Sequence, residues 1–292
     1  MTRFLVVGDL NLDIFVTDLQ SDVSPGEVLS PIHVRAGGAA GTFAWTAATR
    51  GASVRFIGAV GRDPAGDLLV RWLQEAKVDT RVFRTPTPTG AVLTLERNRE
   101  HRVMCSRGAN GDLTVHRAAL SDALSGVDHL HVSGYAFLFD RQLKIAEAAI
   151  AEASVRGIPI STAPPPAGRI ETFGVDRLLA ASAQAAYVFP NRQEGAVLAG
   201  VSDPQAVVDA LQSRFPRGAL TLGEEGAIAW IEDERCRVPA RRVATQDTVG
   251  AGDTFAAAFL VSWYASHDCA TAVRDGCAAA HDLLRHRAQS AS

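Results

Sequence analysis

The sequence predicts an α/β fold, in which helices cover both faces of a mainly parallel, doubly wound sheet. Two observations carry this expectation. Short apolar runs alternate regularly with helix-compatible segments, above all after residue 128. The first run, residues 4–8, is apolar throughout and is closed by Gly8 and Asp9. Such a run is typical of a strand that is buried on both faces of a parallel sheet.

The first half of the chain adds two hairpins to this pattern. Residues 14–35 mix valines with polar residues around Pro25 and Gly26, which predicts a hairpin that leaves the sheet. A second hairpin is predicted where residues 91–95 and 102–105 flank a charged tip. We expect both excursions, about residues 14–36 and 84–105, to form a small β lid on a single domain spanning residues 1–292.

The remaining elements follow in order along the chain. A helix over residues 41–50 and a strand over 54–61 complete a strand–helix–strand crossover after the first strand. The later segments repeat this alternation. We expect helices at residues 67–76, 141–156 and 204–214, and strands at 129–132, 159–162, 187–189 and 219–222.

Composition narrows the class of partner. The formal net charge of -3 gives no field that would attract nucleic acid or an acidic membrane, so a small-molecule partner is expected. The four cysteines are scattered without a CxxC pair, and the N-terminus lacks a long apolar segment after its basic residue. These features favour a cytoplasmic protein.

The strongest chemical signal is the run Asp247-Thr248-Val249-Gly250-Ala251-Gly252-Asp253 before a small, apolar helix. The amides of Gly250, Ala251 and Gly252 would stand at a helix N-terminus, where an anionic phosphate is the natural ligand. Asp253 beside that anion would accept a hydroxyl proton during transfer, or it would only cap the helix; spacing alone leaves both readings open. No P-loop and no dinucleotide glycine fingerprint is present.

This run resembles the second signature of the ribokinase-like (PfkB) carbohydrate kinases. The similarity continues through residues 8–13, 36–41 and 61–66, and through residues 191–194 and 221–226, in family order. The resemblance implies a ribokinase-like three-layer α/β/α sandwich with a β lid. It also implies an ATP-dependent phosphotransferase that acts on an alcohol, with Asp253 as the base and Gly250, Ala251 and Gly252 as the anion hole.

The resemblance further assigns residues to the nucleotide and to its metal. Asn191 and Glu194 match an element that organises Mg²⁺ and the triphosphate, with Glu194 toward the metal. Thr221, Gly223 and Gly226 match positions near the nucleotide, as does Thr248 in the run before the anion hole. ATP and Mg²⁺ are therefore expected, and a potassium ion is left open.

On the acceptor side, Asn11 and Asp13 match polar positions that bind hydroxyl groups, and Gly37 and Gly38 would let the backbone approach a sugar ring. Thr42 stands where the family signature has asparagine, which weakens an assignment to ribose. Arg107 follows the second hairpin and would meet an acidic substituent, unless it is a solvated loop arginine.

A sugar is the first expectation for the acceptor. A nucleoside of the adenosine, cytidine or pseudouridine type is the nearest alternative, and a non-catalytic sugar or nucleoside sensor is the alternative from another class. A homodimer formed through the lid is also expected from the resemblance. Two smaller expectations concern buried side chains. His129 and His131 should not both face one core unless Leu130 is exposed. Trp45 and Trp72 should lie in the core.

Overall fold

Strand β1 (Arg3–Val7) lies inside the main sheet of the computed structural model, which describes residues 1–17, 29–97, 100–244 and 247–290. The sheet order is β13-β12-β11-β10-β9-β8-β1-β4-β5. All neighbouring pairs are parallel except β11–β12 and β12–β13. The strands are β4 (Ser53–Gly61), β5 (Asp79–Thr85), β8 (His129–Ser133), β9 (Ile160–Ala163), β10 (Tyr187–Val188), β11 (Arg217–Thr221), β12 (Ala227–Ile231) and β13 (Glu234–Val238).

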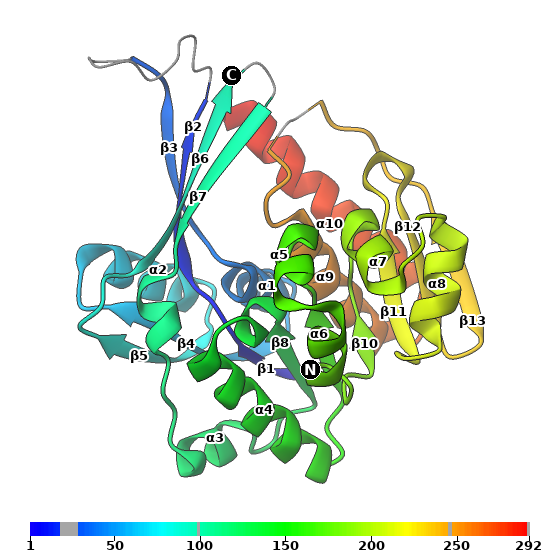
Figure 1. The fold of residues 1–292 in the computed structure, drawn as a ribbon, viewed down its shortest axis with the longest axis horizontal. Coiled ribbons are helices and arrows are strands. Elements are labelled where there is room, and N and C mark those ends of the chain that lie inside the picture. Colours follow the sequence, from blue (N-terminus) through cyan, green and yellow to red (C-terminus); the bar gives the residue numbers. More distant parts are fainter. Residues whose placement is uncertain (18–28, 98–99, 245–246, 291–292) are drawn as a thin grey trace.

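Helices cover both faces of this sheet, so the predicted three-layer α/β/α sandwich is confirmed (Figure 1). One face is covered by α1 (Ala39–Thr49), α2 (Pro64–Glu75), α9 (Ala251–Ser266) and α10 (Cys269–Ser290). The other face is covered by α3 (Arg117–Ala123), α4 (Asp140–Val155), α5 (Ala167–Phe173), α6 (Val175–Ala181), α7 (Arg192–Ala199) and α8 (Pro204–Gln212).

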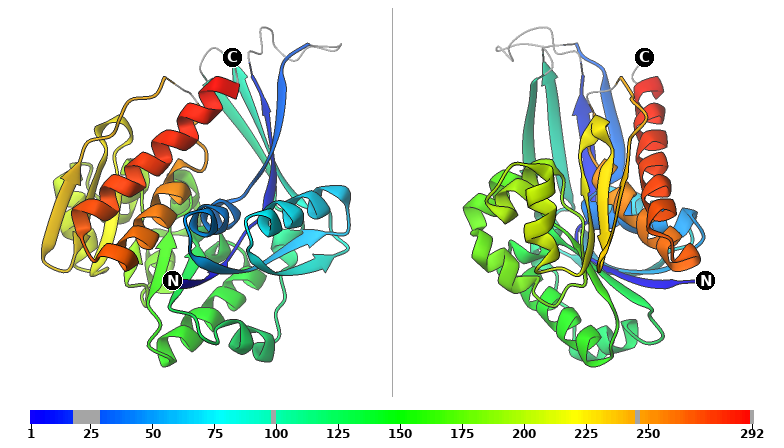
Figure 2. Two further views of the ribbon diagram at one scale, coloured as in Figure 1. Left: turned by 180° about the vertical axis from the view of Figure 1, so that it is seen from behind. Right: turned by 90° about the vertical axis from the view of Figure 1, so that its right-hand side faces the viewer.

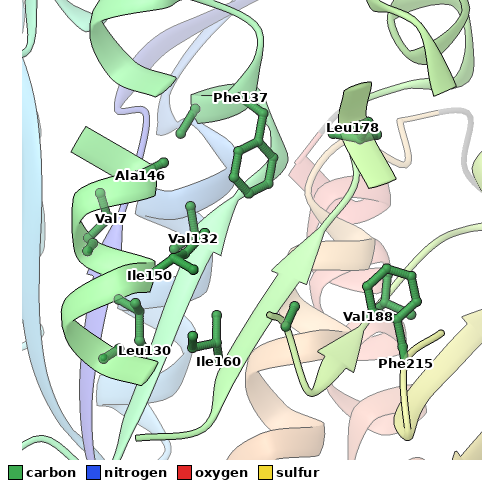
Figure 3. Packing of buried hydrophobic residues seen from close by; sticks show 14 of the residues in the cluster. Val7, Leu130, Val132, Phe137, Ala146, Ile150, Ile160, Leu178, Val188 and Phe215 are labelled. Atoms are coloured by element: carbon green, nitrogen blue, oxygen red, sulfur yellow. The ribbon is translucent and has the colours of Figure 1, made fainter. Parts of the chain in front are cut away.

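The core on the second face shows how the layers hold together (Figure 3). Val7, Leu130 and Val132 point from the strands toward Ala146 and Ile150 of α4, and Val188 contributes to the same cluster next to Phe215. Each of these side chains is buried. Burial of a side chain of this size stabilises the fold by about 1.5–3 kcal/mol, which fixes β1 and β8 and hence the loops at their carboxyl ends.

The lid is a second sheet with the order β3-β2-β6-β7. Its strands are β2 (Asn11–Val16), β3 (Ile32–Gly37), β6 (Gly90–Arg97) and β7 (Glu100–Ser106). Figures 1 and 2 show these strands rising from the body, with the C-terminal end of α10 beside them. Both predicted hairpins are present, although residues 84 and 85 belong to β5 of the main sheet, and the tip of the first hairpin, residues 18–28, lies outside the described residues.

Two smaller expectations are wrong. His129, Leu130 and His131 are all fully buried, because the sheet is covered on both faces and the histidines bond to Ser161 and Tyr264. Trp45 is 37% exposed at the edge of a groove and not in the core, whereas Trp72, which stacks on it with ring centroids 6.0 Å apart, packs against the core as expected. Within the described ranges, no helix has the length and apolar character needed to cross a bilayer.

Candidate active site

The polar loop after β1 forms the floor of the candidate site. β1 pairs with β4 on one side and with β8 on the other, so the loops at its carboxyl end lie at a topological switch point, where α/β sheets bind ligands. Asp9 in this loop is 1% exposed and accepts hydrogen bonds from Ser133 Oγ at 2.9 Å, Asn11 Nδ2 at 3.1 Å and the Ala39 amide at 3.2 Å. The Asp9 carboxylate thereby bonds to strand β8, to helix α1 and to the start of β2.

The predicted anion pocket lies at the N-terminus of α9. Gly250 adopts a left-handed φ of 75° and is the residue before the helix, which explains why glycine is needed there. The Ala251 amide donates to the Thr248 carbonyl at 3.2 Å, so it is not open to a ligand as predicted. Among the described residues, none accepts a hydrogen bond from the amides of Gly250, Gly252 or Asp253. The amides of Gly250, Gly252 and Asp253 are therefore the ones at this helix end that could bind an anion, whereas the Ala251 amide holds the turn.

Asp253 occupies the first turn of α9 and is half-buried. Burial raises its pKa well above the usual range, and the neighbouring acids Asp9, Glu194 and Asp13 raise it further, while Arg287 opposes them. The helix dipole would favour the charged carboxylate, so desolvation and like charges dominate here. Asp9 after β1, Asp13 on β2 and Glu194 in the first turn of α7 therefore lie near enough for their charges to act on the Asp253 carboxyl group. A carboxyl group of raised pKa is suited to accept a proton from an alcohol.

The Asp13 carboxylate on β2 packs closely against Gly37 on the neighbouring strand β3. Asp13 on β2 is 6% exposed, and burial raises its pKa to about 7. A Cβ at Gly37 would lie 2.0 Å from Asp13 Oδ2, so only glycine allows this carboxylate its position. Gly38 has a φ of 90°, and a Cβ there would lie 2.7 Å from the Asp9 carbonyl oxygen. The two glycines are therefore required by close approach to the acidic loop.

Asn11 is held by its protein neighbours. Its Oδ1 accepts a hydrogen bond from Asn110 Nδ2 at 2.8 Å, while its Nδ2 donates to Asp9. Asn110 also closes the loop by bonding both the amide and the carbonyl of Leu10. One Nδ2 hydrogen and one lone pair of Asn11 remain for a hydroxyl group.

Thr42 and Arg107 border the same cleft. The Thr42 methyl group lies 3.3 Å from the position of a Cβ built on Gly250, which places this threonine beside the anion pocket. Arg107 is 15% exposed, donates to Gln142 at 3.1 Å and has its Nη1 4.0 Å from Asp9 Oδ2. Its guanidinium also lies over the rings of Tyr135 and Phe139. Arg107 is therefore a buried cation of the site and not a solvated loop arginine.

On the nucleotide side, Asn191 and Glu194 form a capping box at the start of α7. Asn191 Oδ1 accepts from the Glu194 amide at 2.9 Å, and the Glu194 carboxylate accepts from the Asn191 amide at 2.9 Å and from its Nδ2 at 2.7 Å. Burial raises the pKa of Glu194 to about 8. The box explains both residue types structurally, and the charge of Glu194 raises the pKa of Asp253.

The other predicted nucleotide residues divide into two groups. Thr221 pairs with Asn191 by a parallel bridge, and Gly223 is exposed with a φ of 62°, so both lie at the carboxyl ends of β10 and β11. Thr248 is exposed and supplies the carbonyl that holds Ala251. Gly226 is buried, and a Cβ there would lie 1.9 Å from the Val238 carbonyl oxygen. Packing against the chain after β13 explains that glycine without a ligand.

The carboxylates of the cleft fit a divalent cation that is held through water. Asp253 and Glu194 are separate acids whose charges oppose each other, and a cation between them would relieve that repulsion. Both oxygens of Glu194 already accept from Asn191, which suits contact with the waters of a hydrated Mg²⁺. Within the described part of the chain, no three acidic, histidine or cysteine side chains cluster as direct metal ligands.

A groove of about 1600 Å³ adjoins the cleft between the lid and helices α1, α2 and α10. Its lining includes Thr42, Asp247 and Arg287, and also Trp45 and Trp72. The sequence interpretation missed four charged or amide side chains of this region: Asp9, Asn110, Arg35 and Arg287. Asp9 belongs to the matched stretch at residues 8–13 and Asn110 follows Arg107 by three residues, whereas Arg35 and Arg287 carry no local signal because the fold brings them together from distant segments.

Comparison with known proteins agrees with this geometry. The chain is 27% identical to ribokinase from Bacillus subtilis (strain 168) over 285 residues, 94% of this chain and 90% of that protein. Among solved structures, a putative ribokinase II from E. coli in complex with ATP and Mg²⁺ has a TM-score of 0.86 at 19% identity, covering 98% of this chain and 93% of that one. Adenosine kinase from Sinorhizobium meliloti has a TM-score of 0.85 at 20% identity, covering 100% and 99%.

The family comparison covers nearly the whole chain. Residues 1–290 match the family described as pfkB family carbohydrate kinase. The match includes the loop after β1, the lid strands and the N-terminus of α9, which together form the cleft. The chain belongs to the pfkB family of carbohydrate kinases and is a phosphotransferase that acts on hydroxyl groups.

Proposed function

We propose that this kinase transfers the terminal phosphoryl group of ATP to a hydroxyl group of a small sugar, with Asp253 as the general base. One observation supports this assignment above the others. A carboxyl group of raised pKa stands in the first turn of α9, next to amides that no described residue uses. This arrangement combines a proton acceptor with a phosphate-binding helix end.

In the proposed reaction, Asp253 removes the proton of the acceptor hydroxyl as its oxygen attacks the terminal phosphorus. The bond from that phosphorus to the bridging oxygen breaks, and ADP leaves. The amides of Gly250, Gly252 and Asp253 would bind the charge that develops on the transferred group. Mg²⁺, held by Glu194 through water, would neutralise charge on the phosphates when it is bound.

The acceptor would lie between Asp13 of the lid and Asp253. Asp13 and Asn11 would bind its hydroxyl groups, and Arg107 sits close enough to Asp9 to fix the shape of that end of the pocket. Gly37 and Gly38 keep the backbone free of side chains on this wall. This polar, compact lining favours a sugar.

A nucleoside is the second candidate acceptor. The groove beside Thr42 leaves room for a group larger than a sugar ring, and two stacked tryptophans belong to its lining. A base attached to the sugar could extend into that groove. The similarity to an adenosine kinase supports the same candidate at the level of fold.

A coupled assay of ADP release across sugars and nucleosides tests the proposed function. We expect turnover with at least one sugar at a rate well above the slow hydrolysis of ATP alone. Turnover only with nucleosides would select the second candidate. Tight acceptor binding without any ADP release in the unmodified protein would contradict the kinase proposal and favour a sensor.

We also propose that the lid mediates a homodimer. Paired positions of the lid strands place aliphatic residues on one shared face: Leu12, Ile14, Val16, Ile32, Val34, Ala91, Leu93, Leu95 and Met104. Ile32 and Val34 on this face are 63% and 55% exposed. A second lid would remove this apolar surface from water.

A cytoplasmic location remains our expectation for a kinase of this family.

A further inference from the structure

Arg287 reaches from the last turns of α10 to the turn that precedes the anion pocket. Its Nη1 donates to Asp247 Oδ1 at 3.2 Å and to the Val249 carbonyl oxygen. Its Nη2 lies 3.8 Å from the position of a Cβ built on Gly250. The side chain is only 13% exposed, and its charge acts on both Asp13 and Asp253. A buried positive charge therefore stands directly behind the proposed phosphate site.

The oxygen atoms that Arg287 binds are ligands that a monovalent cation would also prefer. A carboxylate oxygen and a main-chain carbonyl oxygen converge at residues 247–249, and the guanidinium occupies the position between them. Arginine keeps its charge at any physiological pH and binds oxygen atoms with fixed geometry. A potassium ion therefore does not fit between these two oxygen atoms, because the guanidinium fills that space.

We propose that Arg287 is a positioning residue that acts as a tethered cation: it holds the turn at residues 247–250 and makes phosphoryl transfer independent of potassium. The catalytic part of this inference, potassium-independent phosphoryl transfer, rests on the proposed function. Its structural part, a guanidinium in place of a free ion, stands on the contacts alone.

The same carboxylate connects the turn with the lid. Arg35 on β3 donates to Asp247 Oδ2, while Arg287 binds Oδ1 of the same group. Arg35 also lies over the Phe15 ring, with 4.0 Å from its central carbon to the ring centroid. The lid strand, the turn and α10 thus meet at one ion cluster. Loss of Arg287 would leave the Asp247 carboxylate with one arginine fewer and the Val249 carbonyl without its donor.

The test compares Arg287→Ala and Arg287→Lys with Arg285→Ala, which removes an exposed arginine from the same helix. Each protein is titrated calorimetrically with adenylyl imidodiphosphate and Mg²⁺, in KCl and in tetramethylammonium chloride of equal ionic strength. Turnover and melting temperature are measured in the same salts. Guanidinium chloride at millimolar concentration is added to the Arg287→Ala protein as a second rescue ion.

We expect the unmodified protein and Arg285→Ala to be unchanged between the two salts. Arg287→Ala should lose roughly 10- to 100-fold in affinity or turnover in tetramethylammonium, and regain part of it with potassium or guanidinium. Arg287→Lys should retain most of the function. Among these proteins, only Arg287→Ala should have a higher melting temperature in KCl than in tetramethylammonium chloride. This measurement needs no nucleotide.

Three results would overturn the inference: a potassium requirement in the unmodified protein, equal behaviour of Arg287→Ala and Arg285→Ala, or a loss that no small cation restores. If the unmodified protein binds the nucleotide analogue but phosphorylates no acceptor, the proposed function fails. The salt dependence of the Arg287→Ala melting temperature still decides the structural part in that case.

Discussion

Several carboxyl groups with raised pKa meet in this cleft, where the fold brings them out of water. Burial is the largest cause for Asp253, Asp13 and Glu194, and the charges of neighbouring acids raise the pKa of Asp253 and Asp13 further. Such groups weaken the ligand-free protein, because the folded state favours their neutral form. In the proposed function they would bind a hydroxyl group and a hydrated cation, and such binding would favour the charged form. The same carboxyl groups that lower the stability of the ligand-free protein are therefore the ones proposed to bind its ligands.

The raised pKa of Asp13 should make the stability of the protein depend on pH in a direction that can be measured. Its pKa is about 7 in the folded protein and near 3.8 without the fold, so the folded state holds more protons between these values. Stability attributable to this group therefore falls as the pH rises from about 4 to 7. The unfolding free energy of the unmodified protein should fall between pH 5 and pH 8. In Asp13→Asn this fall should be smaller by up to about 3 kcal/mol. Urea unfolding at both pH values measures it.

The control for that experiment is Asp233→Asn, which changes an exposed aspartate in the turn between β12 and β13. It should keep the pH dependence of the unmodified protein. If Asp13→Asn also keeps that dependence, then the carboxyl group of Asp13 is not held at a raised pKa.

At the scale of elements, two helix starts serve the site in different ways. α9 begins at a glycine and leaves amides open to a ligand, whereas α7 begins with a capping box that uses its own side chains. α8 provides a comparison, because Asp203 caps it by accepting from the Ala206 amide at 2.9 Å. A cap of this kind contributes about 1 kcal/mol to stability.

Asn191→Ala and Asp203→Ala separate the capping role from the nucleotide role. Both variants should lose about 0.5–2 kcal/mol in unfolding free energy. Only Asn191→Ala should raise the KM for ATP, because it removes the Nδ2 donor that holds the Glu194 carboxylate, the proposed partner of the hydrated Mg²⁺. Thermal unfolding and steady-state kinetics measure the two effects. An equal KM in both variants would mean that the box at α7 is structural only.

The sequence predicted those elements whose pattern is local. The apolar run of β1, the helix after Gly252 and both lid hairpins stand where expected. Strand β5 was missed, since Asp79–Thr85 lies at the edge of the sheet, mixes charged residues and threonines with only two apolar residues, and lacks a buried run. The β12–β13 hairpin was missed as well, because it reverses the parallel pattern.

The site shows the same limit. Asp253 and Gly250 belong to one contiguous run, so sequence reasoning could place them together. Arg35, Asp247 and Arg287 are far apart along the chain and meet only when the lid strand β3 and the end of α10 pack against the turn before α9. No local pattern marks such a cluster. The Ala251 amide was assigned to the ligand for a similar reason, since its bond to Thr248 depends on the exact path of the turn.

At the scale of the whole molecule, the lid stands out from the body on one small sheet (Figure 2). One face carries Asp13 and Arg35 toward the cleft, and the other face is aliphatic. A sheet with such a face is stable in water only when the face is covered. A dimer formed through the lids would support the acceptor wall of each subunit.

Val34→Asp tests this arrangement, since it places a charge in the middle of the aliphatic face. We expect it to convert the dimer to a monomer in sedimentation equilibrium and to raise the KM for the acceptor more than that for ATP. Val155→Asp is the matched control, because Val155 is 88% exposed at the end of α4 and away from the lid. A monomeric unmodified protein at micromolar concentration would refute the lid dimer.

The central claim is that Asp253 accepts the proton of the attacking hydroxyl group, and single-turnover phosphoryl transfer measures this step most directly. Asp253→Asn should slow transfer by roughly 10²–10⁴-fold, while its affinity for ATP stays within a few-fold of the unmodified protein. Asp176→Asn, which changes an exposed aspartate in the first turn of α6, should transfer at the normal rate. Transfer by Asp253→Asn within tenfold of the unmodified rate would contradict the account.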